Sequence, residues 1–143
     1  MAVSEDENRS ASVSQHDALA RVFPAEAASV RRARETVAEL AQAHAAAPDR
    51  VDDIRLAVSE AATNVVMHAY QEHESGAHFR LLALVGGAEL LVIIDDEGCG
   101  LSSPARTPGL GMGLKLMREL AEQALFLTRD HGGSAVQLRF RLR

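Results

Sequence analysis

The chain has 143 residues, a length typical of a single domain. Its composition, 47% hydrophobic and 24% charged, is ordinary for a globular protein with a packed core. A net charge of −5 and few aromatic side chains (four Phe, one Tyr and no Trp) argue against binding to a nucleic-acid backbone or stacking on single-stranded bases.

The first residues differ in character from the rest of the chain. Residues 1–15 are rich in Ser, Glu, Asp and Asn, and we expect them to form a flexible tail. We expect residues 16–143 to form one domain. Apolar residues over 18–23 predict a short strand, which the chain-breaking Pro24 ends.

Two helices are predicted next. Apolar residues recur at three- and four-residue spacing from 25 to about 46, the pattern of an amphipathic helix. We expect Asp49 to be the N-cap of a second helix over about 50–70, with Asp52 at its third position. This second helix has a broad apolar face.

The second half of the chain is predicted to be mainly strands, and a Gly86-Gly87 pair indicates a hairpin turn. Its predicted elements are strands over 78–85 and 89–94, a loop over 98–109, a helix over 114–123, and strands over 124–128 and 135–142. The order predicts an α/β (α+β) two-layer sandwich with a mixed, mainly antiparallel sheet and helices on one face.

Cys99 is the single cysteine, so no disulfide can form within the chain, which fits a reducing compartment. No basic N-terminal segment precedes an apolar run, and no apolar stretch approaches about 18 residues. We therefore expect a cytoplasmic protein with neither a signal peptide nor a membrane span.

A polar stripe marks the second predicted helix, because Glu60, Asn64 and His68 lie four residues apart. An Asn side-chain oxygen on such a stripe can bind Mg²⁺, which prefers hard oxygen ligands. A carboxylate one turn away can orient or deprotonate a nucleophile near the same metal. The alternative is a partly solvated helix face, to which we assign His68.

An acidic glycine turn follows the predicted strand over 89–94. Asp96 can accept a hydrogen bond from an exocyclic amine such as that of adenine, and Gly98 and Gly100 let the backbone approach a flat base. The neighbouring Asp95 is expected to point to the opposite face. The alternative is a plain turn, because Asp and Gly favour turns.

A third segment is rich in glycine. Gly109, Gly111 and Gly113 precede a helix that we expect to begin near Leu114, and amides at a helix N-terminus bind anions. No Gly-Lys-Ser/Thr triplet occurs and no strand stands directly before the glycines, so neither a Walker loop nor a dinucleotide fingerprint is present. The alternative is a flexible loop that starts a helix.

The three segments occur in an order that predicts one adenine, Mg²⁺ and phosphate site. Ser134 follows a Gly-Gly turn, and its hydroxyl can hydrogen-bond the base side of the same pocket. A Gly-Gly turn is also commonly structural.

The set resembles the ATPase fold shared by bacterial histidine kinases, gyrase, mismatch-repair and heat-shock chaperone ATPases, and most of all the small anti-sigma-factor serine kinases. Residues 59–64 with 68–70 resemble their N-box, and residues 96–100 their G1 box. Residues 109–114 resemble their G2 box, and 132–136 their final box, where Ser134 replaces the more usual Thr. The resemblance runs from about Leu19 to the C-terminus.

The resemblance implies that Asn64 binds Mg²⁺, that Glu60 is the general base toward a serine hydroxyl and that Asp96 contacts adenine. It implies further nucleotide contacts from Gly98, Gly100, Gly109, Gly111, Gly113, Leu114 and Ser134. The implied cofactors are ATP and Mg²⁺, and the implied substrate is a serine of a small anti-anti-sigma protein. A sigma factor is the implied sequestered target, a homodimer is implied, and no nucleic-acid or membrane partner is expected.

The segment between Gly100 and Gly109 has only eight residues, whereas a histidine kinase usually carries a longer lid and a phosphoacceptor helix. This favours a stand-alone serine kinase over a sensor fragment. A detached ATPase domain of a larger machine is not expected, because the sequence shows no transducer or dimerisation segment. The remaining alternative is a nucleotide-binding partner-switch or sigma-binding regulator without meaningful kinase activity.

Overall fold

The computed structural model of the chain describes residues 16–72, 76–96, 110–128 and 134–143. These ranges contain five strands and three helices. In chain order they are β1 (His16–Pro24), α2 (Ala27–Ala43), α3 (Pro48–Glu72), β2 (His78–Gly86), β3 (Glu89–Asp96), α4 (Leu110–Leu120), β4 (Gln123–Thr128) and β5 (Ser134–Arg141). The predicted tail over 1–15 and the predicted loop over 98–109 lie outside the described residues.

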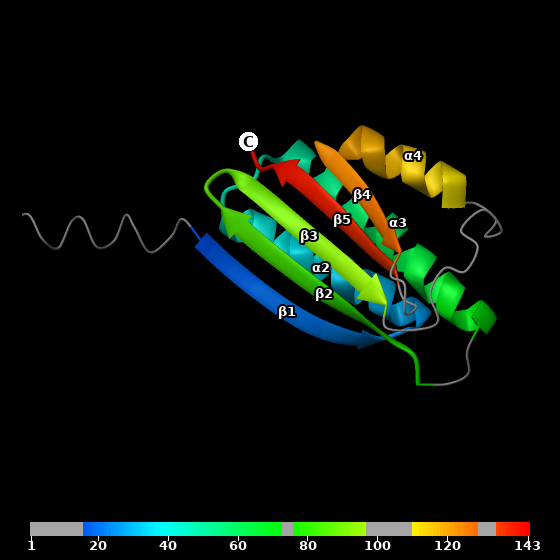
Figure 1. Ribbon diagram of the computed structural model, residues 1–143. Helices are drawn as coiled ribbons and strands as arrows, with labels where there is room; N and C mark the ends of the chain where they lie inside the picture. Colours follow the sequence, from blue (N-terminus) through cyan, green and yellow to red (C-terminus); the bar gives the residue numbers. More distant parts are fainter. Residues whose placement is uncertain (1–15, 73–75, 97–109, 129–133) are drawn as a thin grey trace, which may run out of the picture.

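The strands form one sheet in the order β1-β2-β3-β5-β4, and each of the four neighbouring pairs is antiparallel. Figure 1 shows the described helices behind this sheet, and none of them lies on its other face, which we call the uncovered face. The predicted two-layer sandwich with helices on one face is confirmed, but the prediction of a mixed sheet was wrong, because all four described strand pairs are antiparallel.

The hairpin between β2 and β3 sets the register of the sheet's centre. Gly86 pairs with Glu89, so the turn consists of residues 87 and 88. Gly87 has a φ of 61°, a left-handed conformation that glycine adopts without steric cost. The predicted hairpin is therefore confirmed, and every later pairing along both strands follows from it.

The core lies between the sheet and the helices. Alternate residues of β2 and β3 face the helix layer and are buried, as period-two alternation requires. Helices α2 and α3 contribute small and branched side chains that allow close packing on the sheet. The fully buried residues include Phe79, Leu81, Leu90, Val92, Ile94, Val37, Ile54, Val58, Met117, Leu138 and Phe140.

Two helix boundaries differ from the sequence prediction. Helix α2 ends at Ala43 because Ala45 takes a left-handed φ of 60° and the chain turns there. Helix α3 begins at Pro48, so Asp49 lies in its first turn and is not the N-cap. The fixed φ of proline suits a first helical turn, and the negative charge of Asp49 complements the helix dipole.

Helix α4 also differs, because it begins at Leu110 and ends at Leu120 instead of spanning 114–123. Its last turn closes where the Ala121 amide donates to the Met117 carbonyl. The Glu122 amide then donates to the Arg139 carbonyl, so that the chain has already joined the sheet, and Gln123 opens β4. Among the described residues, no helix is long and apolar enough to cross a bilayer.

Candidate nucleotide-binding site

Helix α3 presents Glu60 and Asn64 toward helix α4. The two residues are one turn apart, so their side chains share a helix face. A Cβ built on Gly113 of α4 would lie 3.2 Å from Asn64 Nδ2, 3.7 Å from Asn64 Oδ1 and 3.3 Å from Glu60 Oε2. The carboxylate and the amide therefore converge on one point beside the backbone of α4.

This contact explains why Gly113 lies inside a helix, where glycine is unfavourable by about 0.8–1.0 kcal/mol relative to alanine. The position is buried, and a side chain there would press on two polar groups of α3. The sequence prediction placed Gly111 and Gly113 in the approach to a helix, and that was wrong, because both lie within α4. Gly113 allows close approach of two helices instead of forming a loose turn.

The environment of Asn64 fits a ligand-binding role. Its Nδ2 atom is buried and has no hydrogen-bond partner among the described residues. Buried polar atoms are usually hydrogen-bonded, so an amide that no described residue holds is suited to turn toward a ligand. The amide oxygen beside the Glu60 carboxylate supplies hard oxygen atoms of the kind that Mg²⁺ prefers.

Asp96 and Ser134 lie side by side at the edge where β3 ends and β5 begins. They are directly opposite in the antiparallel register, and both are buried, with exposed fractions of 3% and 8%. Residues 90, 92 and 94 of β3 are in the core, so by alternation Asp96 also faces the helix layer. On its other side, Asp96 is paired with the buried Phe79 of β2.

Asp95 points to the uncovered face, as predicted. Its carboxylate accepts two hydrogen bonds from Arg80 of β2, Nε to Oδ1 at 2.8 Å and Nη2 to Oδ2 at 2.7 Å. The sequence reasoning missed Arg80. The hairpin register contained the signal, because counting back from the pair Gly86 and Glu89 places Arg80 opposite Asp95.

Both pairs of candidate residues lie on the same side of the sheet, since α3 packs against α4, β3 and β5. Leu114 is half-buried against the core. Three other predicted site residues, Gly98, Gly100 and Gly109, lie outside the described residues. His68 lies in α3, and the structure does not describe its side chain.

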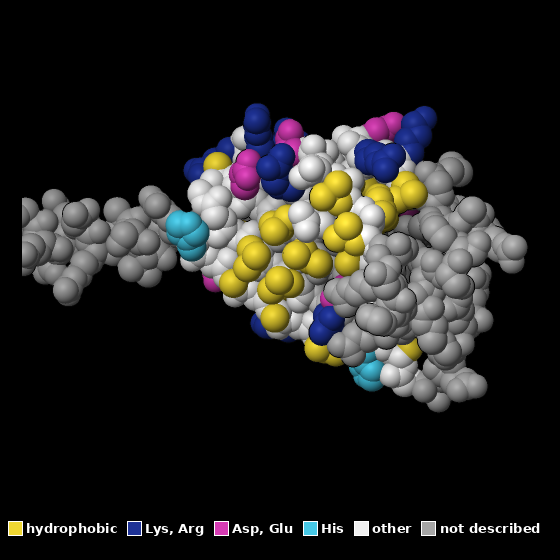
Figure 2. Space-filling view, in the orientation of Figure 1, with side chains coloured by type: hydrophobic (Ala, Val, Ile, Leu, Met, Phe, Trp, Pro, Cys, Tyr) yellow, Lys and Arg dark blue, Asp and Glu magenta, His cyan; other side chains and the backbone are white. Residues whose placement is uncertain are grey.

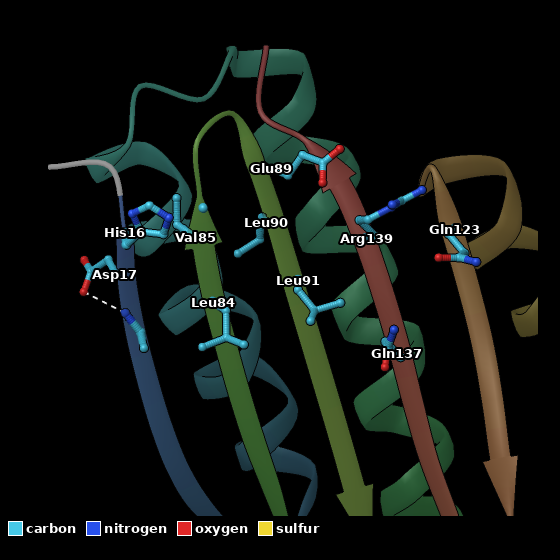
Figure 3. Close-up of a pocket in the computed structure, with 12 residues that line it drawn as sticks. His16, Asp17, Leu84, Val85, Glu89, Leu90, Leu91, Gln123, Gln137 and Arg139 are labelled. Atoms are coloured by element: carbon cyan, nitrogen blue, oxygen red, sulfur yellow. Dashed lines mark hydrogen bonds between the residues drawn. The ribbon is translucent and has the colours of Figure 1, made fainter. Parts of the chain in front are cut away.

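A cavity of about 740 Å³ lies elsewhere, on the uncovered face of the sheet. Figure 3 shows its apolar floor of Leu84 and Leu91, with polar groups such as Gln137 and Arg139 along one side. The sheet separates this cavity from Asp96 and from the helix layer. Its described lining residues include no glycine-rich helix start, so we do not assign the nucleotide to it.

The chain is similar to known proteins of one family. Residues 23–140 match the histidine kinase-like ATPase domain. That match includes every candidate site residue identified above.

Among curated proteins, an anti-sigma F factor of Clostridium acetobutylicum is 35% identical over 71 residues, which cover 50% of this chain and 48% of that protein. The chain thus spans about half the length of that relative. A serine-protein kinase RsbW of Halalkalibacterium halodurans is 33% identical over 118 residues, covering 80% of this chain and 70% of the relative.

A solved structure is also similar. The crystal structure of the RsbU and RsbW domains of a Mycobacterium tuberculosis protein matches with a TM-score of 0.65 and 26% identity, and the match covers 88% of this chain and 32% of that one.

Proposed function

The chain belongs to the histidine kinase-like ATPase family, in the branch of the anti-sigma F factors and RsbW serine-protein kinases, and we propose that it is an ATP-dependent serine protein kinase that acts as an anti-sigma factor. The observation that carries the proposal is the convergence of Glu60 and Asn64 on Gly113. A carboxylate and an amide held together at a closely packed helix pair suit phosphoryl transfer, which needs mainly positioning and charge neutralisation.

Each described site residue has a role in this proposal. Asp96 accepts a hydrogen bond from the exocyclic amine of adenine, and the Ser134 hydroxyl lies beside it to hydrogen-bond the base. Asn64 would hold Mg²⁺ through its side-chain oxygen, where the metal would supply positive charge to the phosphates. Glu60 accepts the proton of the attacking serine hydroxyl.

The relatives' names, anti-sigma F factor and serine-protein kinase, point to a sigma factor as the target and to serine as the phosphate acceptor. We propose that the phosphate acceptor is a serine of an anti-anti-sigma protein and that the sequestered protein is a sigma factor. Both the phosphorylation and the binding of the sigma factor would take place in the cytoplasm. The chain's net charge of −5 is consistent with protein partners in place of nucleic acid.

The test uses purified protein, Mg-ATP and an anti-anti-sigma protein from the same organism. We expect phosphoserine in the partner by mass spectrometry, and none when that serine is replaced by alanine. Capture of a sigma factor without phosphorylation of any partner would favour the alternative, a nucleotide-binding regulator without meaningful kinase activity.

The uncovered sheet face supports a homodimer as the assembly state. Antiparallel sheets with one solvated face usually alternate apolar and polar residues, but β2 and β3 carry apolar residues on both faces. Figure 2 shows hydrophobic side chains gathered over the middle of this face, and charged groups mainly toward its rim. Its exposed large hydrophobic residues are Val22, Leu84, Leu125 and Leu127.

A second copy can cover this face by a two-fold contact of identical patches. Sedimentation equilibrium should give a dimer for the wild type and a monomer for Leu84→Glu. Leu56→Glu is the matched control, because Leu56 is 44% exposed on α3 while Leu84 is 36% exposed on the sheet. A monomeric wild type, or a dimer that survives Leu84→Glu, would remove the proposed dimer without affecting the nucleotide site.

A further inference from the structure

The Arg80–Asp95 ion pair has features beyond those of an ordinary surface salt bridge. The guanidinium donates both Nε and Nη2 to the two carboxylate oxygens, at 2.8 and 2.7 Å, which is the strong bidentate arrangement. The Asp95 side chain is only 11% exposed, while that of Arg80 is 45% exposed. The carboxylate of the pair is therefore largely shielded from water, and charge interactions are stronger where water is excluded.

The pair lies at the end of the sheet that carries the proposed adenine contact. Arg80 and Asp95 are directly opposite each other, and the next pair outward is Phe79 with Asp96. On the other side of β3, Asp96 is paired with the first residue of β5, Ser134. Asp96 is the last described residue of β3, and strand ends are where local opening of a sheet is easiest.

Asp95 and Asp96 are adjacent in β3, but they lie on opposite faces of the sheet and have different roles. Asp95 is held on the uncovered face by Arg80, and so by alternation Asp96 must face the helix layer. A slip of β3 by one residue would exchange the two carboxylates between faces. The ion pair opposes the slip that would place Ile94 opposite Arg80, because the guanidinium would then face an apolar side chain.

We propose that the Arg80–Asp95 ion pair is a positioning device that fixes the end of β3 and aims the Asp96 carboxylate at the exocyclic amine of the base. The inference rests on the proposed function, in which Asp96 is the adenine contact. Arg80 and Asp95 do not touch the nucleotide, since they lie on the opposite face of the sheet. They determine how strongly the site distinguishes adenine from a base that lacks the amine.

The experiment compares the affinities for ATP and for purine riboside triphosphate, which differs from ATP only in lacking that amine. A hydrogen bond to a charged group corresponds to a wild-type preference for ATP of roughly 10- to 100-fold. In Asp95→Asn and Arg80→Met we expect this preference to fall several-fold, while the affinity for purine riboside triphosphate stays the same. Arg80→Lys keeps the charge but loses the bidentate geometry, and it should be intermediate.

A control and a second variant keep the test decisive. Glu122→Gln breaks another ion pair, with Arg50 at 3.6 Å, far along the chain from β3, and should leave the preference unchanged. If Asp95→Asn does not fold, Arg80→Lys answers the same question with a milder change. Thermal unfolding without nucleotide shows whether each variant is folded.

Three outcomes would overturn the inference. Variants that retain the full preference for ATP, or that lose affinity equally for both nucleotides, would show that the pair stabilises the sheet without aiming Asp96. A wild type without any preference would remove the adenine contact itself, and with it this inference. The wild-type measurement therefore separates failure of the proposed function from failure of the ion pair's role.

Discussion

Replacing Gly113 by alanine separates the stability of helix α4 from the geometry of the site. The added Cβ would lie 3.2 Å from Asn64 Nδ2 and 3.3 Å from Glu60 Oε2. Comfortable contacts are about 3.5–4.0 Å, so both side chains must move by a few tenths of an ångström. The position is buried between the two helices, which restricts how the strain can relax.

The two effects of Gly113→Ala have opposite signs. Alanine is favoured over glycine inside a helix by about 0.8–1.0 kcal/mol, so the melting temperature should stay the same or rise. A misplacement of about 1 Å can reduce catalysis by about 10²-fold, so a shift of a few tenths should reduce phosphoryl transfer by roughly 3- to 10-fold. A stable protein with weakened function is the expected signature.

Calorimetric titration with Mg-ATP, a phosphoryl-transfer assay and thermal unfolding would be run on the same preparations. Glu119→Ala is the control, because Glu119 is exposed on the same helix. If Gly113→Ala transfers phosphate at the wild-type rate and binds Mg-ATP with the wild-type affinity, the claim that the close approach of α4 positions Glu60 and Asn64 is refuted. A loss of function that appears equally in Glu119→Ala would also count against it.

Three further predictions concern the base contact, acid stability and the core. Asp96→Asn should weaken ATP binding by roughly 10- to 100-fold, since a hydrogen bond to a charged group contributes about 1.5–3 kcal/mol, and calorimetry would measure it. The hydrogen bond with His44, at 3.1 Å, lowers the pKa of Asp17 below its usual 3.8, so its stabilising effect is present above that pH and is lost as the pH falls through the lowered pKa. The melting temperatures of the wild type and Asp17→Asn should therefore differ at about pH 6 and converge well below pH 3.8, and a constant difference would contradict this. Ile54→Ala, at a fully buried position, should reduce the free energy of unfolding in urea by about 2–5 kcal/mol.

Local sequence signals predicted most of the fold correctly. The Gly86-Gly87 pair indicated the hairpin, and the helical spacing of apolar residues predicted α2 and α3, because these features depend on short-range geometry. The same spacing placed Glu60 and Asn64 on one face. These parts of the site were predictable since one helix carries both residues.

Contacts between distant segments explain what the sequence reasoning missed. The start of α4 was placed too late because glycine is unfavourable in helices, and the approach of Gly113 to α3 is visible only in three dimensions. The Arg80–Asp95 pair joins two strands, and Arg80 can be recognised as the partner of Asp95 only from the register of the hairpin. Propensity describes single positions, whereas these features depend on how elements pack.

The central claim, that Glu60 is the base of a nucleotide-dependent kinase site, is tested most directly by Glu60→Gln. The substitution keeps the shape of the side chain beside Gly113 but removes its proton-accepting charge. Single-turnover transfer to a serine of the partner and calorimetric binding of Mg-ATP would be measured on the same protein. We predict a loss of transfer of about 10²- to 10⁴-fold with Mg-ATP affinity retained. Transfer at the wild-type rate would contradict the claim.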